Sequence, residues 1–464
     1  MRTRHFTESL RLSCLVAVLS TLVLSPVLAQ PPAEQGSGIP AEQDSGLSND
    51  AVPTIVVTDD GNTRSQVRLA FPPATYDSSL DGTYLEAAKE VERALREDFE
   101  QMVVFNAQGP TELSVLTLTG QREHDFAQYR SLGNEIVLLA TLRREDDRVL
   151  LDGWVYDLPS QQSVLGKRFR GTRDQARLVA HYLADAMHFQ FTGRPSLALT
   201  TIAFHSNRDG NQELYLMDYD GYNQRQISRH TSTSGYSDWS RDGDAIAYMS
   251  YYAGTPGIYY VEIDTGRKVT VYRDGTLNLS PSFAPDGQQM AFAHSRSANV
   301  DIYTCGRVCN DPKRITQSPA IDTNPAWSPD GERIAFTSSR SGRPNIYVMD
   351  KDGSNVRRIS FEGNYNDGAG WRSDGTQLVY ASRKGNNFRI AVTNLIDLKT
   401  TIVASGSGSY EEPSFSPDGD RIVFTAKRNG GSQIFVMDAN GSNLRQLTHE
   451  GDNAGGSWSW FPQR

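Results

Sequence analysis

An apolar tripeptide recurs every 44 residues from residue 202 onward, and this repeat restricts the fold more than any other feature of the chain. Its six copies are Ile202-Ala203-Phe204, Ile246-Ala247-Tyr248, Met290-Ala291-Phe292, Ile334-Ala335-Phe336, Leu378-Val379-Tyr380 and Ile422-Val423-Phe424. Asp-Gly pairs, a strong hairpin signal because glycine tolerates positive φ, precede five of the copies, as in Asp242-Gly243. Four short strands in each repeat of this length are typical of a β-propeller blade.

The order of strands within the repeat also predicts how the ring closes. The first repeat begins at its second strand, near Thr200, whereas the aromatic strand Ser457–Phe461 has no repeat after it. Pairing these two segments would complete one blade from both ends of the repeat region and hide two exposed strand edges. We therefore predict a mainly β fold, a six-bladed propeller of four-stranded blades with velcro-type closure, preceded by a small α/β domain.

Composition shifts divide the chain into four expected parts. Residues 1–29 have a basic start, an apolar run and small residues before Gln30, the order of a secretory signal peptide. Residues 30–52 are rich in Pro, Gly, Ser, Gln and Glu and predict a flexible tail. Strand-like runs and two amphipathic helical patterns predict an α/β domain over 53–195, and the propeller would occupy 196–464.

The expected segments of the α/β domain follow from periodicity and punctuation. Strands are expected at Thr54–Val57, Gln66–Phe71, Met102–Phe105, Glu135–Leu142, Arg148–Tyr156 and Ser163–Arg170. One helix would carry Leu85 to Phe99 after a cap at Asp81 or Thr83, and another would begin at Thr172 or Asp174.

The charge balance argues against nucleic acid and an anionic membrane surface as the main partner. The whole chain has 46 basic and 55 acidic residues, and removing residues 1–29 takes away three arginines and Glu8, leaving 43 against 54, or −11. No other stretch approaches the length of a transmembrane helix. The mature chain is therefore expected to be exported, soluble, monomeric and not inserted in a membrane.

Charged residues repeat with the blades on one expected face of the ring. Five of six equivalent loop positions are basic: Arg208, Tyr252, Arg296, Arg340, Lys384 and Arg428. Adjoining loops carry acids at Asp238, Asp322, Asp367, Glu411, Glu412 and Asp452. One interpretation is pairing between neighbouring blades, which stabilises by at most ~1 kcal/mol per exposed pair. The other is a ring of mixed charge that orients a partner at the channel mouth.

No sequence pattern identifies a catalytic, cofactor or metal site. The chain contains no His-Glu-x-x-His and no Gly-x-Ser-x-Gly. Asp218-x-Asp220-Gly221 resembles a fragment of a calcium loop but lacks the glycine and glutamate that an EF-hand requires, so a tight turn is the better account. His181 and His188 share one predicted helix, and we interpret both as ordinary, partly buried histidines.

Cys305 and Cys309 are predicted to form a disulfide. Subtracting one repeat from Met349 and Gly353 gives these two positions, which places the cysteines on either side of a tight hairpin turn. Residues facing each other across such a turn can lie about 5.5 Å apart, within disulfide range. Free thiols or a metal pair remain the alternatives.

Three segments carry a resemblance to a known family. Asp218-Tyr219-Asp220-Gly221-Tyr222-Asn223-Gln224 looks like that family's own turn, Trp327 to Gly331 reads Trp-Ser-Pro-Asp-Gly, and Phe191-Thr192-Gly193 ends the last helix of the first domain in a similar way. With the signal peptide and the α/β domain, the chain from about Thr54 onward resembles the TolB family of the Tol–Pal system. The resemblance implies a periplasmic, non-enzymatic adaptor without a cofactor, supporting outer-membrane integrity and invagination during cell division.

The resemblance also implies two partners. The propeller would bind the peptidoglycan-associated lipoprotein Pal, and the amino-terminal segment would be recognised by TolA. Loop positions expected on the Pal-type face are Leu277, Asn278, Thr323, Asn324, Tyr365, Tyr410, Arg296 and Arg340. The TolA-type segment is Thr54, Ile55, Val56, Val57, Thr58 and Asp59, preceded here by the tail.

Two other classes of function remain open at this point. One is a periplasmic hydrolase or lyase with its active site in the propeller channel. The other is a carrier for a small ligand or sugar.

Overall fold

The computed structural model describes residues 43–44, 66–229, 232–296, 299–428 and 430–462. The described residues belong to one compact unit. The expected signal peptide, the tail 30–52 apart from Gln43 and Asp44, and the expected strand Thr54–Val57 lie outside the described residues. Within the described part of the chain, no helix has the length and apolar character needed to cross a membrane.

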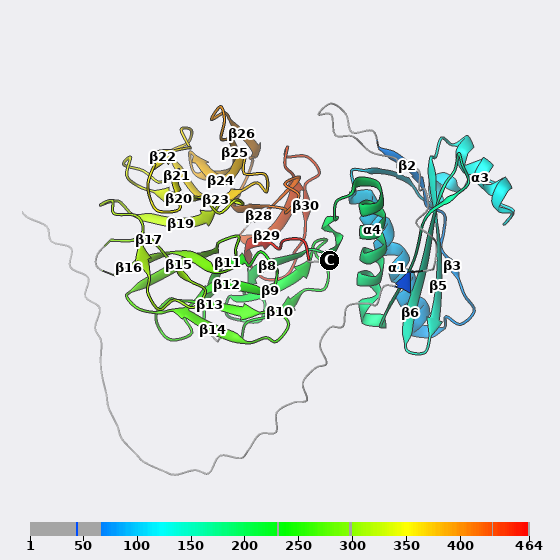
Figure 1. Cartoon of the computed structure of the whole chain (residues 1–464), viewed down its shortest axis with the longest axis horizontal. Helices are drawn as coiled ribbons and strands as arrows, with labels where there is room; N and C mark the ends of the chain where they lie inside the picture. The colour runs from blue at the N-terminus through cyan, green and yellow to red at the C-terminus, as the bar shows by residue number, and fades with distance from the viewer. Residues whose placement is uncertain (1–42, 45–65, 230–231, 297–298, 429, 463–464) are drawn as a thin grey trace, which may run out of the picture. The chain divides into compact units, whose positions relative to one another are not determined.

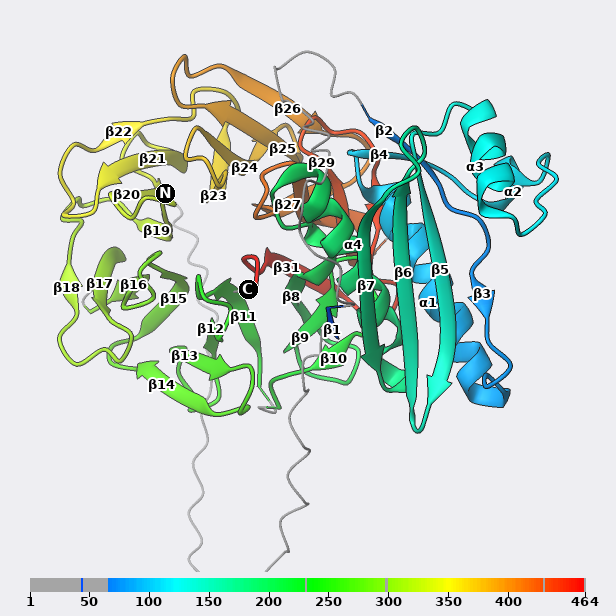
Figure 2. The ribbon, with the colours of Figure 1, turned by 45° about the vertical axis from the view of Figure 1, so that its right-hand side comes forward.

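Six four-stranded antiparallel sheets form the propeller (Figures 1 and 2). Blade 1 contains β31 (Asn453–Trp458), β8 (Thr201–Ser206), β9 (Glu213–Asp218) and β10 (Arg225–Gln226). Blade 2 contains β11 (Ser234–Trp239), β12 (Ala245–Ser250), β13 (Gly257–Glu262) and β14 (Lys268–Tyr272). Blade 3 contains β15 (Leu277–Phe283), β16 (Gln289–Ser295), β17 (Asp301–Gly306) and β18 (Lys313–Arg314).

The other three blades repeat this plan. Blade 4 contains β19 (Asp322–Trp327), β20 (Arg333–Ser338), β21 (Asn345–Asp350) and β22 (Arg357–Arg358). Blade 5 contains β23 (Tyr365–Trp371), β24 (Gln377–Lys384), β25 (Asn387–Asn394) and β26 (Thr400–Ala404). Blade 6 contains β27 (Ser409–Phe415), β28 (Arg421–Arg428), β29 (Gly431–Asp438) and β30 (Arg445–Gln446).

The repeated tripeptide packs neighbouring blades together. Its two large outer residues and its smaller middle residue point to opposite faces of the second strand of each blade. Ile246 and Tyr248 share a core cluster with Ala203 of blade 1, whereas Ala247 lies in the cluster of blade 3. The same alternation holds at every boundary, up to Val423 of blade 6 in one cluster with Ile202 and Phe204 of blade 1. Burial on both faces explains why these strands are apolar throughout.

The predicted closure of the ring is confirmed. Strand β31 pairs antiparallel with β8, with Trp458 opposite Ile202 and Ser457 opposite Ala203. The indole Nε1 of Trp458 donates to the Thr200 hydroxyl at 2.8 Å. The pairing strand begins at Asn453 and ends at Trp458, whereas the sequence pattern indicated 457–461.

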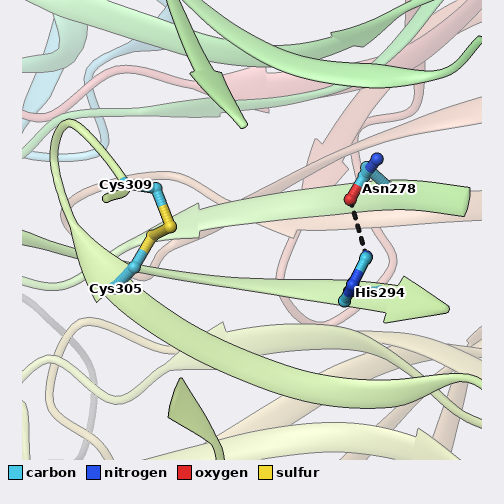
Figure 3. The surroundings of a disulfide bond; sticks show 4 residues. All are labelled: Asn278, His294, Cys305 and Cys309. Atoms are coloured by element: carbon cyan, nitrogen blue, oxygen red, sulfur yellow. Dashed lines mark hydrogen bonds between the residues drawn. A yellow bond between two sulfur atoms is a disulfide. The ribbon is translucent and has the colours of Figure 1, made fainter. Parts of the chain in front are cut away.

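A disulfide joins Cys305 and Cys309 in blade 3, as predicted, with the two Cα atoms 5.3 Å apart (Figure 3). At the position of Cys309 the equivalent turns of blades 4 and 6 carry Gly353 and Gly441. A Cβ there would lie 2.1 Å and 2.2 Å from a carbonyl oxygen of the preceding blade. Blade 3 therefore turns differently, and its half-cystines pack into the core shared with blade 2.

The amino-terminal α/β domain is a seven-stranded sheet. Its strand order is β1 (Gln43–Asp44), β7 (Ser163–Gly171), β6 (Arg148–Asp157), β5 (Ile136–Glu145), β2 (Val67–Ala70) and β4 (Phe105–Gln108), with β3 (Thr75–Tyr76) on β5. Helices α1 (Gly82–Gln101) and α4 (Ala176–Thr192) share one core with the sheet (Figure 2). Short elements α2 (Pro110–Leu113) and α3 (Arg122–Ser131) contribute Leu113 and Phe126 to a second cluster.

Most expected segments of this domain have counterparts in the structure. The exception among the described strands is Met102–Phe105, which is wrong by three residues because α1 continues to Gln101 and Met102 caps it. The last helix begins after Thr172, whose backbone N–H and side chain form a capping box with Gln175 in η1 (Arg173–Gln175). The helix ends at Gly193, with φ +70°. A second short turn, η2 (Leu197–Leu199), leads into β8.

Loss of the closing strand should destabilise the propeller. Trp458→Ala should cost about 3–5 kcal/mol in the free energy of unfolding, because it empties a buried aromatic site at the seam. Trp458→Phe is the matched control, since Phe283 and Phe415 occupy equivalent positions, and should cost only about 1 kcal/mol for the lost hydrogen bond. Urea denaturation measures both variants. A chain ending before Gly455 that keeps full stability as a monomer would contradict the closure.

Candidate functional site

The first strands of the six blades line a central cavity of about 610 Å³. Figure 2 shows the arrangement of the blades in a ring. Strand β11 contributes Asp238 and Trp239 to its lining, and β23 contributes Asp367. These strands are the innermost of each sheet, since each is an edge strand of its sheet and contributes residues to the cavity lining. The cavity therefore lies at the axis of the propeller, where loops from all blades can meet a ligand.

Each innermost strand has a β-bulge at the same place. The ladder shifts register there in all six blades. The residues at this position have positive φ values: Tyr236 (55°), Ser280 (51°), Asn324 (48°), Gly368 (64°), Glu412 (53°) and Gly455 (68°). A left-handed conformation costs an ordinary residue roughly 1–2 kcal/mol, so this ring of bulges is a constrained feature that directs side chains toward the cavity.

Three acids of the innermost strands lie between blades. Asp238 accepts a hydrogen bond from the Phe283 backbone N–H of blade 3 at 2.7 Å. Asp367 of blade 5 accepts from the amide of Asn324 and the hydroxyl of Thr337 in blade 4, each at 2.7 Å. These bonds join each acid to a neighbouring blade.

The third acid, Glu412 of blade 6, accepts from the Gly455 backbone N–H of blade 1 at 2.8 Å. Burial raises the pKa of all three acids, and that of Asp238 reaches about 7 despite its hydrogen bonds. The cavity is thus lined by carboxyl groups whose burial favours the protonated form.

The residues expected on the Pal-type face differ in their accessibility. Asn324 lines the cavity, and Thr323 beside it is half-buried. Leu277 and Tyr365 are also half-buried, and Arg296 is exposed. These five positions keep at least part of their surface accessible.

The other three expected residues have internal partners. Asn278 is fully buried, donates to the carbonyl oxygens of Pro256 and Asp274 at 2.9 Å, and contacts His294 (Figure 3). Tyr410 is only 4% exposed and packs in the core of blade 6. Arg340 pairs with Asp322 at 3.0 Å. The contact of the loop arginine recurs in blades 1 and 6, where Arg208 donates to Asn453 and Arg428 donates to Tyr410.

The loop charges were expected to pair between neighbouring blades. This prediction is wrong for the two ion pairs that the structure shows there, because both join residues of a single blade. Arg340 and Asp322 belong to the same blade, as do Lys427 and Glu411, which lie 2.7 Å apart. The physical reason is that the first and second strands of a blade are hydrogen-bonded, so their adjoining loops are closer than those of the next blade. Lys427 and Glu411 are partly exposed and stabilise their blade only slightly, whereas the side chain of Asp322 is fully buried.

A second cluster lies between the helices of the α/β domain and blade 1. Within the described residues, Asp98, His181 and Asp220 are the one group of three His, Cys, Asp or Glu side chains close enough to hold a metal, with all ligand atoms within 4.8 Å. Arg177 donates to Asp220, and the Tyr219 hydroxyl donates to Asp98 at 2.6 Å. Because a guanidinium already supplies positive charge, we interpret this cluster as a buried ion-pair network.

Sequence reasoning missed two parts of these sites. His181 was expected to be partly buried, but it is 1% exposed and bound to Asp98 from another helix. The six bulge positions with positive φ have no uniform residue type, since Tyr236, Ser280 and Glu412 share only their spacing. The prolines that follow Ser280, Asn324 and Glu412 were a signal of an interrupted ladder at three of the six positions.

The repeats match a known protein family. Residues 189–461 match the family described as the TolB beta propeller domain. The chain is 32% identical to "Tol-Pal system protein TolB" of Desulfosudis oleivorans over 180 residues, covering 39% of this chain and 41% of the relative. It is 32% identical to "Protein TolB homolog" of Chlorobium luteolum over 257 residues, covering 46% and 59%. The chain thus spans about half the length of the curated relatives it matches.

A solved structure has the same fold. The crystal structure of TolB from Acinetobacter baumannii superimposes with a TM-score of 0.72, covering 85% of this chain and 97% of that one at 24% sequence identity. This likeness extends over both the α/β domain and the propeller.

The stability of the channel should depend on the charge of Asp238. A folded pKa of about 7, above that of the unfolded chain, means that the protonated form stabilises the fold and that this stability is lost as pH rises through 7. Asp238→Ser introduces the residue found at the equivalent positions Ser282 and Ser414. From pH 5 to pH 8 the wild type should lose at most about 3 kcal/mol relative to the variant, less where channel water screens the charge. Parallel pH curves in chemical denaturation would contradict this assignment.

Proposed function

The chain belongs to the TolB β-propeller domain family, and from this premise we propose that it is a non-enzymatic periplasmic adaptor of the Tol–Pal type. Its propeller would bind a Pal-type lipoprotein at the channel mouth, and its amino-terminal segment would contact TolA. In this role it would support outer-membrane integrity and invagination during cell division. The observation that carries the proposal is the six-bladed propeller, with its bulged, acid-lined cavity, in a chain of this family.

The bulge ring supports binding by the channel face. Contact residues on these bulged strands are held by the ladder with the second strand of the blade and by a constrained backbone, so a partner meets a surface that needs little ordering. Thr323 and Asn324 stand at such a bulge, between the exposed loops and the cavity. Arg296 is exposed and offers a positive charge that is suited to orienting a partner.

Enlarging Thr323 should weaken binding to a Pal-type lipoprotein. Thr323→Ile places a bulkier side chain without a hydroxyl group at the proposed interface and should cost about 2 kcal/mol or more, roughly thirty-fold in affinity. Thr401→Ile is the matched control, since Thr401 is exposed on the outermost strand β26 of blade 5. Calorimetric titration with the purified lipoprotein measures both. Equal affinity of the two variants and the wild type would remove Thr323 from the interface. Tyr410→Ala is unsuitable as a test, because Tyr410 is a core residue.

The amino-terminal contact is proposed for Thr54–Asp59, which lies outside the described residues. Deleting Gln30–Val52 should preserve binding to TolA if the segment Thr54–Asp59 carries the recognition. Deleting residues 54–59 alone, with the tail kept, should abolish binding and serves as the reciprocal control. A pull-down with purified TolA measures both deletions. Loss of binding in the first deletion alone would move the recognised segment into the tail.

A further inference from the structure

A histidine is held between carboxylates of the two domains. His181 of α4 is 1% exposed, and its Nδ1 lies 2.9 Å from a carboxylate oxygen of Asp98 on α1. Its Nε2 lies 3.6 Å from a carboxylate oxygen of Asp220, in the turn between β9 and β10 of blade 1. The side chains of both acids are fully buried. We call Asp98, Arg177, His181, Tyr219 and Asp220 the junction cluster.

The charges around His181 favour its protonated form. The acids near His181 belong to α1 and to the turn between β9 and β10 of blade 1. One arginine of α4, Arg177, lies among these acids. Arg177 pairs with Glu90, Glu97 and Asp220, so its single positive charge is shared by three carboxylates. The ionisable groups around the cluster are Asp98, Glu90 and Glu97 of α1, Arg177 of α4, Asp218, Tyr219 and Asp220 of blade 1, and Arg421 and Arg445 of blade 6.

The two arginines of blade 6 do not replace the charge of His181. Arg445 donates to the Gln101 side chain at 2.9 Å, and Arg421 donates to the Gln101 carbonyl oxygen, at the end of α1. The carboxylates nearest the ring, Asp98 and Asp220, are therefore balanced by Arg177 and His181. A neutral imidazole would leave one buried carboxylate without a counter-charge, which is costly.

We propose that His181 carries a proton in the folded protein and, as an imidazolium between Asp98 and Asp220, holds the α/β domain to blade 1, so that loss of this proton loosens the junction. The contact is formed by groups of both domains and of opposite charge. It makes the attachment of the domains sensitive to pH, a property beyond the proposed adaptor function.

The direction of the pH effect follows from the surroundings. Burial alone would lower the pKa of His181, but the carboxylates of Asp98 and Asp220 outweigh it and raise this pKa above the usual value of 6.5. The stabilisation is therefore fully present below about pH 6.5 and is lost as pH rises through the folded pKa. Asp218, whose pKa is also raised by burial, acts in the same direction.

The charge of His181 can be measured directly. In the full-length mature protein with labelled histidines, the ring of His181 should remain protonated above pH 6.5. His205 is an internal reference, since it is buried in blade 1 without a hydrogen-bond partner among the described residues and burial lowers its pKa to about 4. Asp220→Asn should lower the pKa of His181 and leave that of His205 unchanged. A neutral His181 ring at pH 6.5 in the wild type would overturn the proposal, and this result needs no variant to fold.

Hydrogen exchange then tests the consequence for the junction. After correction for intrinsic rates, opening of amides in α1 and in residues 218–222 should increase about tenfold per pH unit between 6.5 and the folded pKa, then level off. His181→Gln should open more readily at pH 6 and lose this pH dependence. Amides of β20 and β21 in blade 4 are the control and should not follow the same curve. Identical pH dependence of junction opening in the wild type and His181→Gln would also overturn the proposal.

Discussion

The packing of large residues of one blade against a small residue of its neighbour determines the rest of this structure. Each blade supplies two large side chains to one boundary and one smaller side chain to the other, so no blade can bury its own second strand on both faces alone. Only in a closed ring do the large side chains of every blade meet the smaller side chain of a neighbouring blade. Val423 against Ile202 and Phe204 shows that the sixth boundary obeys the same rule as the first. The channel, its bulges and its loops are held in place by this ring.

Much of the propeller could be predicted because its constraints are periodic. The tripeptide spacing, the Asp-Gly turns and the unpaired strand near residue 458 led to the blades, the closure and the cysteine pair. The site was harder to predict because the spacing of the repeat does not show which way a side chain of the first strand points. Asn278 and Tyr410 occupy loop-like positions in the pattern, yet His294 and the blade 6 core hold them inside. Only a partner from another strand decides such cases.

The α/β domain shows a similar division. Long strands such as β5 and β6 follow their apolar pattern, whereas β4 is displaced because helix α1 extends further than its last apolar residue, Phe99. The short α2 and α3 have weak periodicity, and tertiary contacts of Leu113 and Phe126 stabilise them. His181 gave no sequence signal beyond a place beside an apolar stripe. Its partners come from positions 83 residues before it and 39 residues after it in the chain.

The pairing of Trp458 with Ile202 also has a kinetic meaning. These partners are separated by 256 residues, and loop-closure entropy must be overcome before their contacts can contribute. Blade 1 cannot be completed until residue 458 has left the ribosome, so a partly synthesised chain presents the open edge of β8. Contacts of this sequence separation make folding slow and favour ring formation as a late event. Only a chain that contains β31 can close the ring. A shorter nascent chain keeps an exposed strand edge, to which chaperones can bind.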